Sequence, residues 1–387
     1  MRFRKPLLMI PGPSEPSPEI LRAAASLMPH YGDEWKKIYD EVLNLSRSIF
    51  KTDGEVLLLP TAGSQAIEAS VVNLVSPKAK VLVGVNGFFG ERVLKIARAH
   101  GREVVVLEKD YGDVILAEDL EKILMKNEDI EAALMIYSET STGVLNPIKT
   151  YGKILRERDI LFIVDAISAY GGVELRMDEW EVDYCVGYPS KALGGLPGVI
   201  PVAISKRAWR MIDERGWSPQ AWFLDFKVWK ECIEEWGPWG HPYPTTMPTH
   251  TVIALREALR RVLEEGLENV YRRHRLIASA FRRAVKTMGL KLIAPEDHAS
   301  PTVTAIRIPQ DFSGKLREVM LKKFDVMIAG GLGRLAGKIV RVGHMGYTAA
   351  ERYISITIAA MAYALRELGF RADFFKALRA FYEALGH

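Results

Sequence analysis

Short, almost continuously apolar runs alternate with amphipathic stretches between residue 55 and about residue 204. Strands that are covered by helices on both faces have this composition, because both of their faces are buried. The helical stretch SQAIEASVVNLV separates the first two runs. The alternation predicts an open, mostly parallel α/β sheet. The seven expected strands are EVLLL (55–59), KVLVGV (80–85), EVVVL (103–107), EAALMIY (131–137), ILFIVD (160–165), DYCVGY (183–188) and VIPVAIS (199–205).

The pattern changes after residue 205. Six of the eight tryptophans lie between residues 209 and 239, a density that favours a core or interface segment over the lining of a site. A helical pattern follows from Thr251 towards Met288, and Gly266 is expected to interrupt it. The runs LKLIA, TVTAIRI and KIVRVGHM and a helical stretch from Ala349 then predict a smaller α+β domain.

These patterns divide the chain into three parts. We expect an N-terminal arm over residues 1–15, a large domain over residues 16–265 and a small C-terminal domain over residues 266–387. A chain of 387 residues with 48% hydrophobic residues is long enough to build two cores.

Charge and cysteine content exclude several classes of function. The net charge of +4 is small and its basic residues are scattered, so a nucleic-acid partner is not expected. The two cysteines, Cys185 and Cys232, form neither a CxxC pair nor a metal-ligand cluster, and no metal site is expected. So few cysteines fit a reducing, cytoplasmic setting. No apolar run has membrane-spanning length, so no membrane partner is expected.

The segment GLGRLA (331–336) matches the GxGxxG/A dinucleotide fingerprint. That fingerprint requires a preceding strand and a following helix early in a βαβ unit. Here a strand pattern, KIVRVG, follows the glycines in the C-terminal domain. We therefore do not expect a nicotinamide cofactor.

Three weaker signals lie at the ends of expected strands. Ala62, Gly63 and Ser64 form a small-residue turn that opens a helix, where free backbone N–H groups can bind a phosphate. Asp165 ends one strand, and Lys191 follows the next within GYPSKALGGLPGVI. Each alone is also compatible with an ordinary turn or cap. Together, on one sheet edge, they match the needs of pyridoxal phosphate: an amine for its aldehyde, a carboxylate for its pyridine nitrogen and an anchor for its phosphate.

The sequence resembles the class V, fold-type-I pyridoxal-phosphate aminotransferases, in particular their alanine–glyoxylate and serine–pyruvate branch. Seven motifs in family order carry the resemblance over nearly the whole chain. They are PGPSEPSPEI, NGFFGERV, SETSTGVLNPI, VDAISAYGG, SKALGGLPG, GLENVYRRHR and GGLGRLAGKIVRVGHMG.

The resemblance implies roles for individual residues. Lys191 resembles the lysine that binds the cofactor covalently, and Asp165 the partner of the pyridine nitrogen. Phe89 and Ile167 are expected on opposite ring faces, although relatives commonly have Trp at the position of Phe89. Arg341 resembles the arginine that binds the substrate α-carboxylate. The remaining implied contacts are Ala62, Gly63, Ser64 and Ser190 at the phosphate, Thr140 near the phenolic oxygen, Gly12, between Pro11 and Pro13, at the substrate entrance, and Tyr243 and Thr246, which reach the phosphate of a neighbouring subunit.

Two of these positions depart from the pattern of many relatives. Ser190 stands where many have Gln, and some have His at the position of Ser64.

The family further implies a homodimer with shared active sites and a ping-pong transamination. A small amino acid, serine or alanine, would donate to pyruvate or glyoxylate. Two alternatives remain open: a lyase of the cysteine-desulfurase type, which needs a nucleophilic cysteine in the C-terminal region, and a non-catalytic subunit that keeps the fold. The preferred substrates, the role of the tryptophan-rich segment and the reach of Arg334 are not determined by the sequence.

Overall fold

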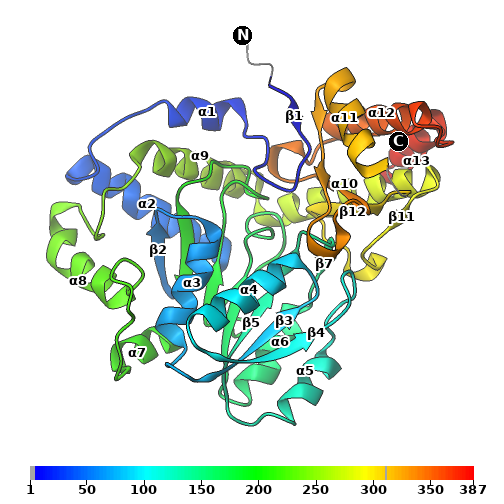
Figure 1. Cartoon of the computed structure of the whole chain (residues 1–387). Helices are drawn as coiled ribbons and strands as arrows, with labels where there is room; N and C mark the ends of the chain where they lie inside the picture. The colour runs from blue at the N-terminus through cyan, green and yellow to red at the C-terminus, as the bar shows by residue number, and fades with distance from the viewer. Residues whose placement is uncertain (1–4, 310–311) are drawn as a thin grey trace.

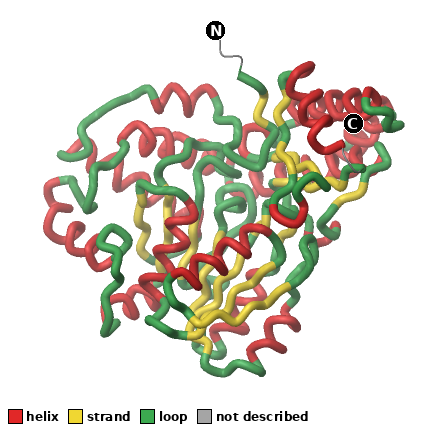
Figure 2. The backbone as a smooth tube through the Cα atoms, in the orientation of Figure 1, coloured by secondary structure: helices red, strands yellow, loops and turns green. Residues whose placement is uncertain are grey.

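The computed structural model describes residues 5–309 and 312–387, so the first four residues of the expected N-terminal arm lie outside it. A helix-covered sheet forms the larger part of the molecule, and a second group of helices and strands lies beside it (Figure 1). Figure 2 shows the strands of the large sheet running between helical segments. Of the helices in the described ranges, none is both long and apolar enough to cross a bilayer.

The large sheet contains seven strands, as the sequence predicts, and their bounds differ from the expected ones only at the ends. Their order is β2-β10-β9-β8-β5-β3-β4. Only β10 runs antiparallel to its neighbours, β2 and β9, so the sheet is mostly parallel. The strands are β2 (Glu55–Leu59), β3 (Lys80–Val85), β4 (Glu103–Glu108), β5 (Ile130–Ile136), β8 (Leu161–Asp165), β9 (Tyr184–Val186) and β10 (Ile200–Ile204).

Helices cover this sheet, and their buried faces join the strands in one hydrophobic core. They are α1 (Pro18–Ala24), α2 (Asp33–Phe50), α3 (Gly63–Leu74), α4 (Phe88–Ala99), α5 (Ala117–Leu124), α6 (Ile148–Arg156), α7 (Lys206–Glu214), α8 (Phe226–Trp236) and α9 (Thr249–Glu265), with a short 3-10 turn at Gly237–Trp239. The short strands β6 (Ser138–Glu139) and β7 (Val144–Leu145) form a hairpin after β5.

The second group of elements is α+β, as expected. Its antiparallel sheet has the order β11-β12-β15-β14 and packs with four helices around a separate core. Its elements are α10 (Leu267–Thr287), β11 (Lys291–Leu292), β12 (Val303–Arg307), α11 (Phe312–Phe324), β13 (Val326–Met327), β14 (Ala329–Gly330), β15 (Ile339–Gly343), α12 (Glu351–Glu367) and α13 (Phe374–Leu385), with 3-10 turns at Glu296–His298, Gly333–Leu335 and Gly346–Thr348.

Gly266 separates α9 from α10, as the sequence predicts, and its φ of 83° is a conformation that glycine adopts without strain. The helix α10 contributes Val270 and Tyr271 to the first core and Phe281 to the second. It therefore links the two halves, and the domain limits given by the sequence stay a prediction.

The N-terminal segment runs with the C-terminal half of the chain. The strand β1 (Leu7–Leu8), dark blue in Figure 1, pairs in parallel with β13. Met9 is buried in the second core. Beyond Met9 the chain turns towards the loop that joins β9 to β10. That loop carries Lys191.

Candidate active site

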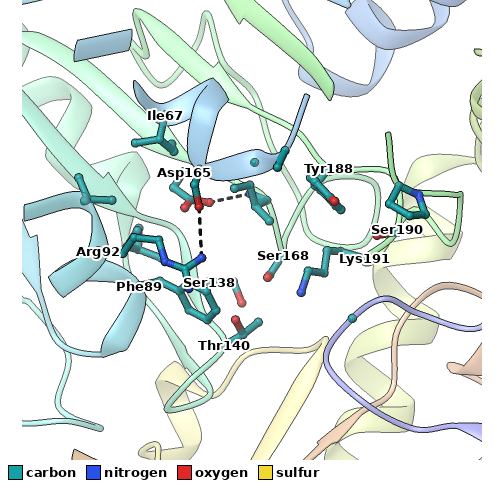
Figure 3. A pocket seen from close by; sticks show the side chains of 18 of the residues that line it. Ile67, Phe89, Arg92, Ser138, Thr140, Asp165, Ser168, Tyr188, Ser190 and Lys191 are labelled. Atoms are coloured by element: carbon teal, nitrogen blue, oxygen red, sulfur yellow. Dashed lines mark hydrogen bonds between the residues drawn. The ribbon is translucent and has the colours of Figure 1, made fainter. Parts of the chain in front are cut away.

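A cavity of about 390 Å³ opens at the edge of the sheet where the parallel strands end, a volume within the usual range for small-molecule sites. Segments that follow β2, β3, β5, β8 and β9 line it, so residues far apart in sequence meet there (Figure 3). Ten of the residues expected from the sequence line the cavity. They are Gly12, Ala62, Gly63, Ser64, Phe89, Thr140, Asp165, Ile167, Ser190 and Lys191.

The first helical turn of α3 forms one wall. An α-helix supplies no carbonyl acceptor for its first N–H groups, so those of Gly63 and Ser64 are suited to an anion. A Cβ atom at Gly63 would lie 2.7 Å from Cδ1 of Ile167, so a larger residue there would require the Ile167 side chain to shift. The Ser64 hydroxyl accepts a hydrogen bond from Arg92 Nη1 at 3.2 Å.

Asp165 lies at the end of β8 with its carboxyl group in the cavity (Figure 3). Burial raises the pKa of Asp165 to about 7, while the hydrogen bond from Ile167 N, at 2.9 Å to Oδ1, acts in the opposite direction. The carboxylate of Glu139 raises the pKa further, and the charge of Lys191 opposes it. A cation beside Asp165 would hold it ionised, so the position suits a protonated ring nitrogen.

Lys191 extends into the same cavity from the β9–β10 loop (Figure 3). Burial lowers the pKa of its amine to about 8, and the positive charge of Arg341 acts in the same direction. Asp165 opposes this shift. A lysine with this pKa is a nucleophile and a proton acceptor near neutral pH.

The N-terminal segment closes over Lys191. The amine donates a hydrogen bond to the carbonyl oxygen of Pro11, and a Cβ atom at Gly12 would overlap the Lys191 side chain. Ser14 fixes the segment through Ser14 N to Ser190 O and Ser14 Oγ to Lys191 O, both at 2.8 Å. The position of the amine therefore depends on this segment.

Phe89 and Thr140 lie across the cavity from Lys191 (Figure 3). Phe89 stands in the first turn of α4 and is half-buried. The guanidinium of Arg92, on the same helix, lies 5.0 Å from the centre of the Phe89 ring. Thr140 follows β6 and is buried.

Arg341 comes from the middle of β15 and is only 6% exposed. Its Nε donates to Gly330 O at 2.8 Å and its Nη1 to Thr140 O at 3.1 Å. No carboxylate in residues 5–309 or 312–387 forms an ion pair with it, and burial lowers its pKa to about 10. A buried cation that only carbonyl groups hold is suited to binding an anion. Arg341 is not among the cavity-lining residues, although its charge acts on Lys191.

The structure does not bring Tyr243 or Thr246 to the cavity of their own chain. Tyr243 is fully buried, and its hydroxyl accepts from Trp35 Nε1 at 2.6 Å and donates to the carbonyl oxygen of His30. Thr246 is exposed. A contact of either residue with a neighbouring subunit stays a prediction, and the internal hydrogen bonds of Tyr243 already occupy its hydroxyl.

Sequence reasoning missed four polar residues that line the cavity: Arg92, Ser138, Ser168 and Tyr188. Arg92 lies three positions after Phe89 on α4, so helical spacing places both on one face. The other three are within three residues of Thr140, Asp165 or Lys191, and proximity in sequence could have indicated them.

Several residues left open by the sequence lie elsewhere. Arg334 pairs with Glu91 at 3.1 Å and Glu108 at 2.8 Å outside the cavity lining. No tryptophan of residues 209–239 lines the cavity, and neither does Cys185 or Cys232. Burial raises the pKa of the Cys185 thiol well above its usual value, so it is no nucleophile for a lyase.

Comparison with known proteins identifies relatives over almost the full chain. An uncharacterized aminotransferase of Methanocaldococcus jannaschii is 35% identical, with 95% of this chain and 94% of that protein covered. A protein named soluble hydrogenase 42 kDa subunit of Anabaena cylindrica is 33% identical, with 94% of each chain covered. The (S)-ureidoglycine–glyoxylate transaminase of Bacillus subtilis is 32% identical, with 96% and 94% covered.

Solved structures agree with these relatives. The ureidoglycine–glyoxylate aminotransferase of Bacillus subtilis superposes with a TM-score of 0.93 at 30% identity, with both chains covered completely. The alanine–glyoxylate aminotransferase of Nostoc sp. gives 0.88 at 31% identity, with 95% of this chain and 97% of that chain covered. Both proteins are fold-type-I pyridoxal-phosphate aminotransferases, and this chain has the same fold.

The family model for aminotransferase class-V matches residues 19–351, which include every expected site residue except Gly12. The match, the relatives and the shared fold confirm the resemblance that the sequence motifs indicate. The chain therefore belongs to the class-V aminotransferases.

Proposed function

We propose that the protein transfers an amino group from a small L-amino acid, serine or alanine, to a small 2-oxo acid, pyruvate or glyoxylate, with pyridoxal phosphate as cofactor. The observation that carries this proposal is the pairing of Arg341 with Lys191. Arg341 is a buried guanidinium without a carboxylate partner in the described ranges. Lys191 is an amine whose pKa is lowered to about 8 by burial and by the charge of Arg341. A substrate that bears both a carboxylate and an amino or oxo group satisfies both.

The cavity residues fit pyridoxal phosphate. The first turn of α3 and the Ser64 hydroxyl suit its phosphate, and Asp165 suits its pyridine nitrogen. Phe89 and Ile167 provide apolar contacts for its ring, and Lys191 supplies the amine that binds its aldehyde. When bound, the cofactor supplies an electron sink for the negative charge that develops at the substrate Cα.

Three residues of this chain then have separate roles in the reaction. Arg341 binds the α-carboxylate of the substrate in two parallel hydrogen bonds, which fixes the substrate Cα. The Lys191 amine first acts as a base and takes the proton from the substrate Cα. It then acts as an acid and gives that proton up again to complete the transfer of the amino group. Asp165 stays ionised and holds the proton on the ring nitrogen.

The reaction is of the ping-pong type in this proposal. The first oxo acid leaves before the second arrives, so one arginine and one lysine serve both half-reactions. A single carboxylate-binding group, Arg341, is consistent with two substrates that both carry an α-carboxylate.

We also propose a cytoplasmic homodimer whose subunits share their active sites. The family resemblance supports this, and exposed Thr246 is free to contact a second copy. Light scattering during gel filtration tests it, because a monomeric mass that persists with bound pyridoxal phosphate contradicts the dimer.

A non-catalytic role is the second candidate, because one relative is named as a hydrogenase subunit. Loss of catalysis would relax the need for the reactive residues, yet the chain keeps Lys191 and Asp165, which line one cavity, and the buried Arg341.

Product analysis separates the candidates. The enzyme is incubated with pyridoxal phosphate and with either alanine plus glyoxylate or serine plus pyruvate. We expect pyruvate plus glycine from the first pair, or hydroxypyruvate plus alanine from the second, and neither from the Lys191→Ala variant. Absence of both products with the wild-type protein, or their formation by Lys191→Ala, contradicts the proposal.

A further inference from the structure

Glu139 is a completely buried carboxyl group directly behind the cavity. It ends β6, has 0% exposure and is not among the residues that line the cavity. No Lys, Arg or His side chain in residues 5–309 or 312–387 forms an ion pair with it. A carboxyl group in such a place is costly to bury unless hydrogen-bond donors surround it.

The donors come from two segments. Oε2 accepts from Phe89 N and Gly90 N, both at 3.1 Å. Oε1 accepts from Ser141 N at 3.0 Å and from Ser141 Oγ at 2.6 Å. The same Ser141 hydroxyl oxygen accepts from Phe88 N at 2.9 Å. Glu139 and Ser141 thus satisfy three N–H groups in the first turn of α4, where the helix dipole favours an acceptor.

The backbone geometry leaves room for this contact only because residue 87 is glycine. A Cβ atom at Gly87 would overlap Cγ and Cδ of Glu139. The φ of Gly87 is −178°, which any residue adopts, so the glycine is needed for space rather than for conformation. The carboxyl group therefore fits against the helix start without an intervening side chain.

The two segments that Glu139 joins both contribute to the site. The α4 segment presents Phe89 and Arg92 to the cavity, and Phe89 N is itself one of the donors. The other segment continues into Thr140, which lines the cavity and whose carbonyl oxygen holds Arg341. One carboxyl group thus sets the distance between the aromatic wall and the turn whose carbonyl oxygen binds Arg341.

We propose that Glu139 is a positioning residue of the active site, which fixes the first turn of α4, and with it the Phe89 ring, against the Thr140 segment. This inference rests on the proposed function, because Phe89 is taken to pack on the cofactor ring. Glu139 touches neither substrate nor cofactor in this account. It acts by position, through Phe89 and Thr140, in addition to the effect of its charge on the pKa of Asp165.

The variants follow from the hydrogen bonds. Glu139→Gln replaces one acceptor oxygen with an NH₂ group that faces N–H donors on whichever side it lies. Ser141→Ala keeps the carboxylate and removes the hydroxyl that links it to Phe88 N. As a matched control, Asp373→Ala removes the cap of α13, where Asp373 Oδ1 accepts from Lys376 N at 3.0 Å on the exposed surface.

The experiment measures binding of pyridoxal phosphate by the full-length apo-protein, the visible circular dichroism of the bound cofactor, and the thermal midpoint. For Glu139→Gln we expect at least tenfold weaker binding and a changed dichroic band. For Ser141→Ala we expect a smaller change in the same direction. For Asp373→Ala we expect a lowered thermal midpoint with wild-type binding and dichroism.

Unchanged binding and dichroism in Glu139→Gln overturn the inference. If Glu139→Gln does not fold, the Ser141→Ala variant decides: wild-type dichroism and binding overturn the inference there too. A wild-type protein that does not bind pyridoxal phosphate overturns the proposed function together with the inference. Normal wild-type binding with unaffected variants overturns the inference alone.

Discussion

The guanidinium of Arg341 donates a hydrogen bond to the carbonyl oxygen of Thr140 at 3.1 Å across 201 positions of sequence. Arg341 belongs to the antiparallel sheet and Thr140 to the segment after β5 in the large sheet. The guanidinium that we propose binds the substrate carboxylate is thus held in part by the half of the molecule that carries Asp165 and Lys191. The relative position of the two halves therefore decides whether the site is complete.

Replacing Arg341 by Gln should weaken substrate binding more than cofactor binding. A charge-assisted bidentate contact contributes about 1.5–3 kcal/mol, so we expect KM for the amino acid to rise about 10- to 150-fold. Steady-state kinetics and a cofactor titration measure the two effects. Arg317→Gln is the control, because Arg317 is exposed near Gly330 and outside the cavity. An unchanged KM in Arg341→Gln contradicts the assigned role.

Replacing Gly12 by Ala should displace the N-terminal segment or the lysine. Gly12 has a φ of 106°, and an added Cβ atom would overlap the Lys191 side chain. We expect a loss of about 1–3 kcal/mol of stability from backbone strain, and slower reaction of the lysine with pyridoxal phosphate. Gly101→Ala separates the two causes, since Gly101 also has a positive φ but no atom within 4 Å of an added Cβ. If Gly12→Ala and Gly101→Ala react equally fast with pyridoxal phosphate, the overlap of the added Cβ atom with Lys191 does not affect the lysine.

The lowered pKa of Lys191 predicts a pH dependence. Only the unprotonated amine attacks an aldehyde, so the rate of cofactor association should rise with pH and level off above about 8. Removing the positive charge in Arg341→Gln should raise the pKa of Lys191 and move the midpoint to higher pH. Stopped-flow absorbance of the apo-protein measures both profiles. A midpoint that stays at the same pH in the variant contradicts the electrostatic coupling.

The same shift affects the stability of the apo-protein. Between pH 8 and the unfolded value of 10.5, the unfolded chain binds the Lys191 proton and the folded chain does not. The contribution of Lys191 therefore makes folding more favourable as pH rises through that interval. Urea unfolding of the wild type and of Lys191→Ala, compared across this range, isolates the effect.

The sequence predicts the fold well where local pattern determines structure. The seven apolar runs became the seven strands, and Gly266 became the break between α9 and α10, because burial on both faces and a positive φ are properties of single segments. The sequence also indicates that Gly63, Asp165 and Lys191 lie at one sheet edge, since each stands at or shortly after the end of a strand, and all three line the cavity. These signals are local.

Contacts that depend on packing between distant segments could not be predicted from the sequence. The hydrogen bonds of Glu139 join residues about 50 positions apart. Both segments carry family motifs, but neither motif indicates that Glu139 joins them. The hydrogen bond from the Lys191 amine to the carbonyl oxygen of Pro11 likewise joins residues 180 positions apart. The resemblance implies that Tyr243 reaches the phosphate of a neighbouring subunit, which stays a prediction. Within its own chain the Tyr243 hydroxyl bonds to Trp35 Nε1 and to the carbonyl oxygen of His30.

The packing of Tyr243 gives a separate prediction. Tyr243→Phe leaves Trp35 Nε1 without its acceptor in a buried place, which costs about 1–3 kcal/mol of unfolding free energy. We expect cofactor affinity to stay unchanged in this variant and to fall in Thr246→Ala if the active sites are shared between subunits. A fall in cofactor affinity at full stability in Tyr243→Phe would instead assign its hydroxyl to a neighbouring active site.

In the proposed function, Lys191 binds pyridoxal phosphate beside a carboxylate-binding arginine. The visible absorption spectrum of the purified protein with pyridoxal phosphate tests it most directly, recorded before and after L-serine or L-alanine is added without an oxo acid. We predict a yellow band of the lysine-bound cofactor that is absent in Lys191→Ala and that one of the two amino acids bleaches. A protein that develops no such band, or keeps it unchanged with both amino acids, contradicts the account.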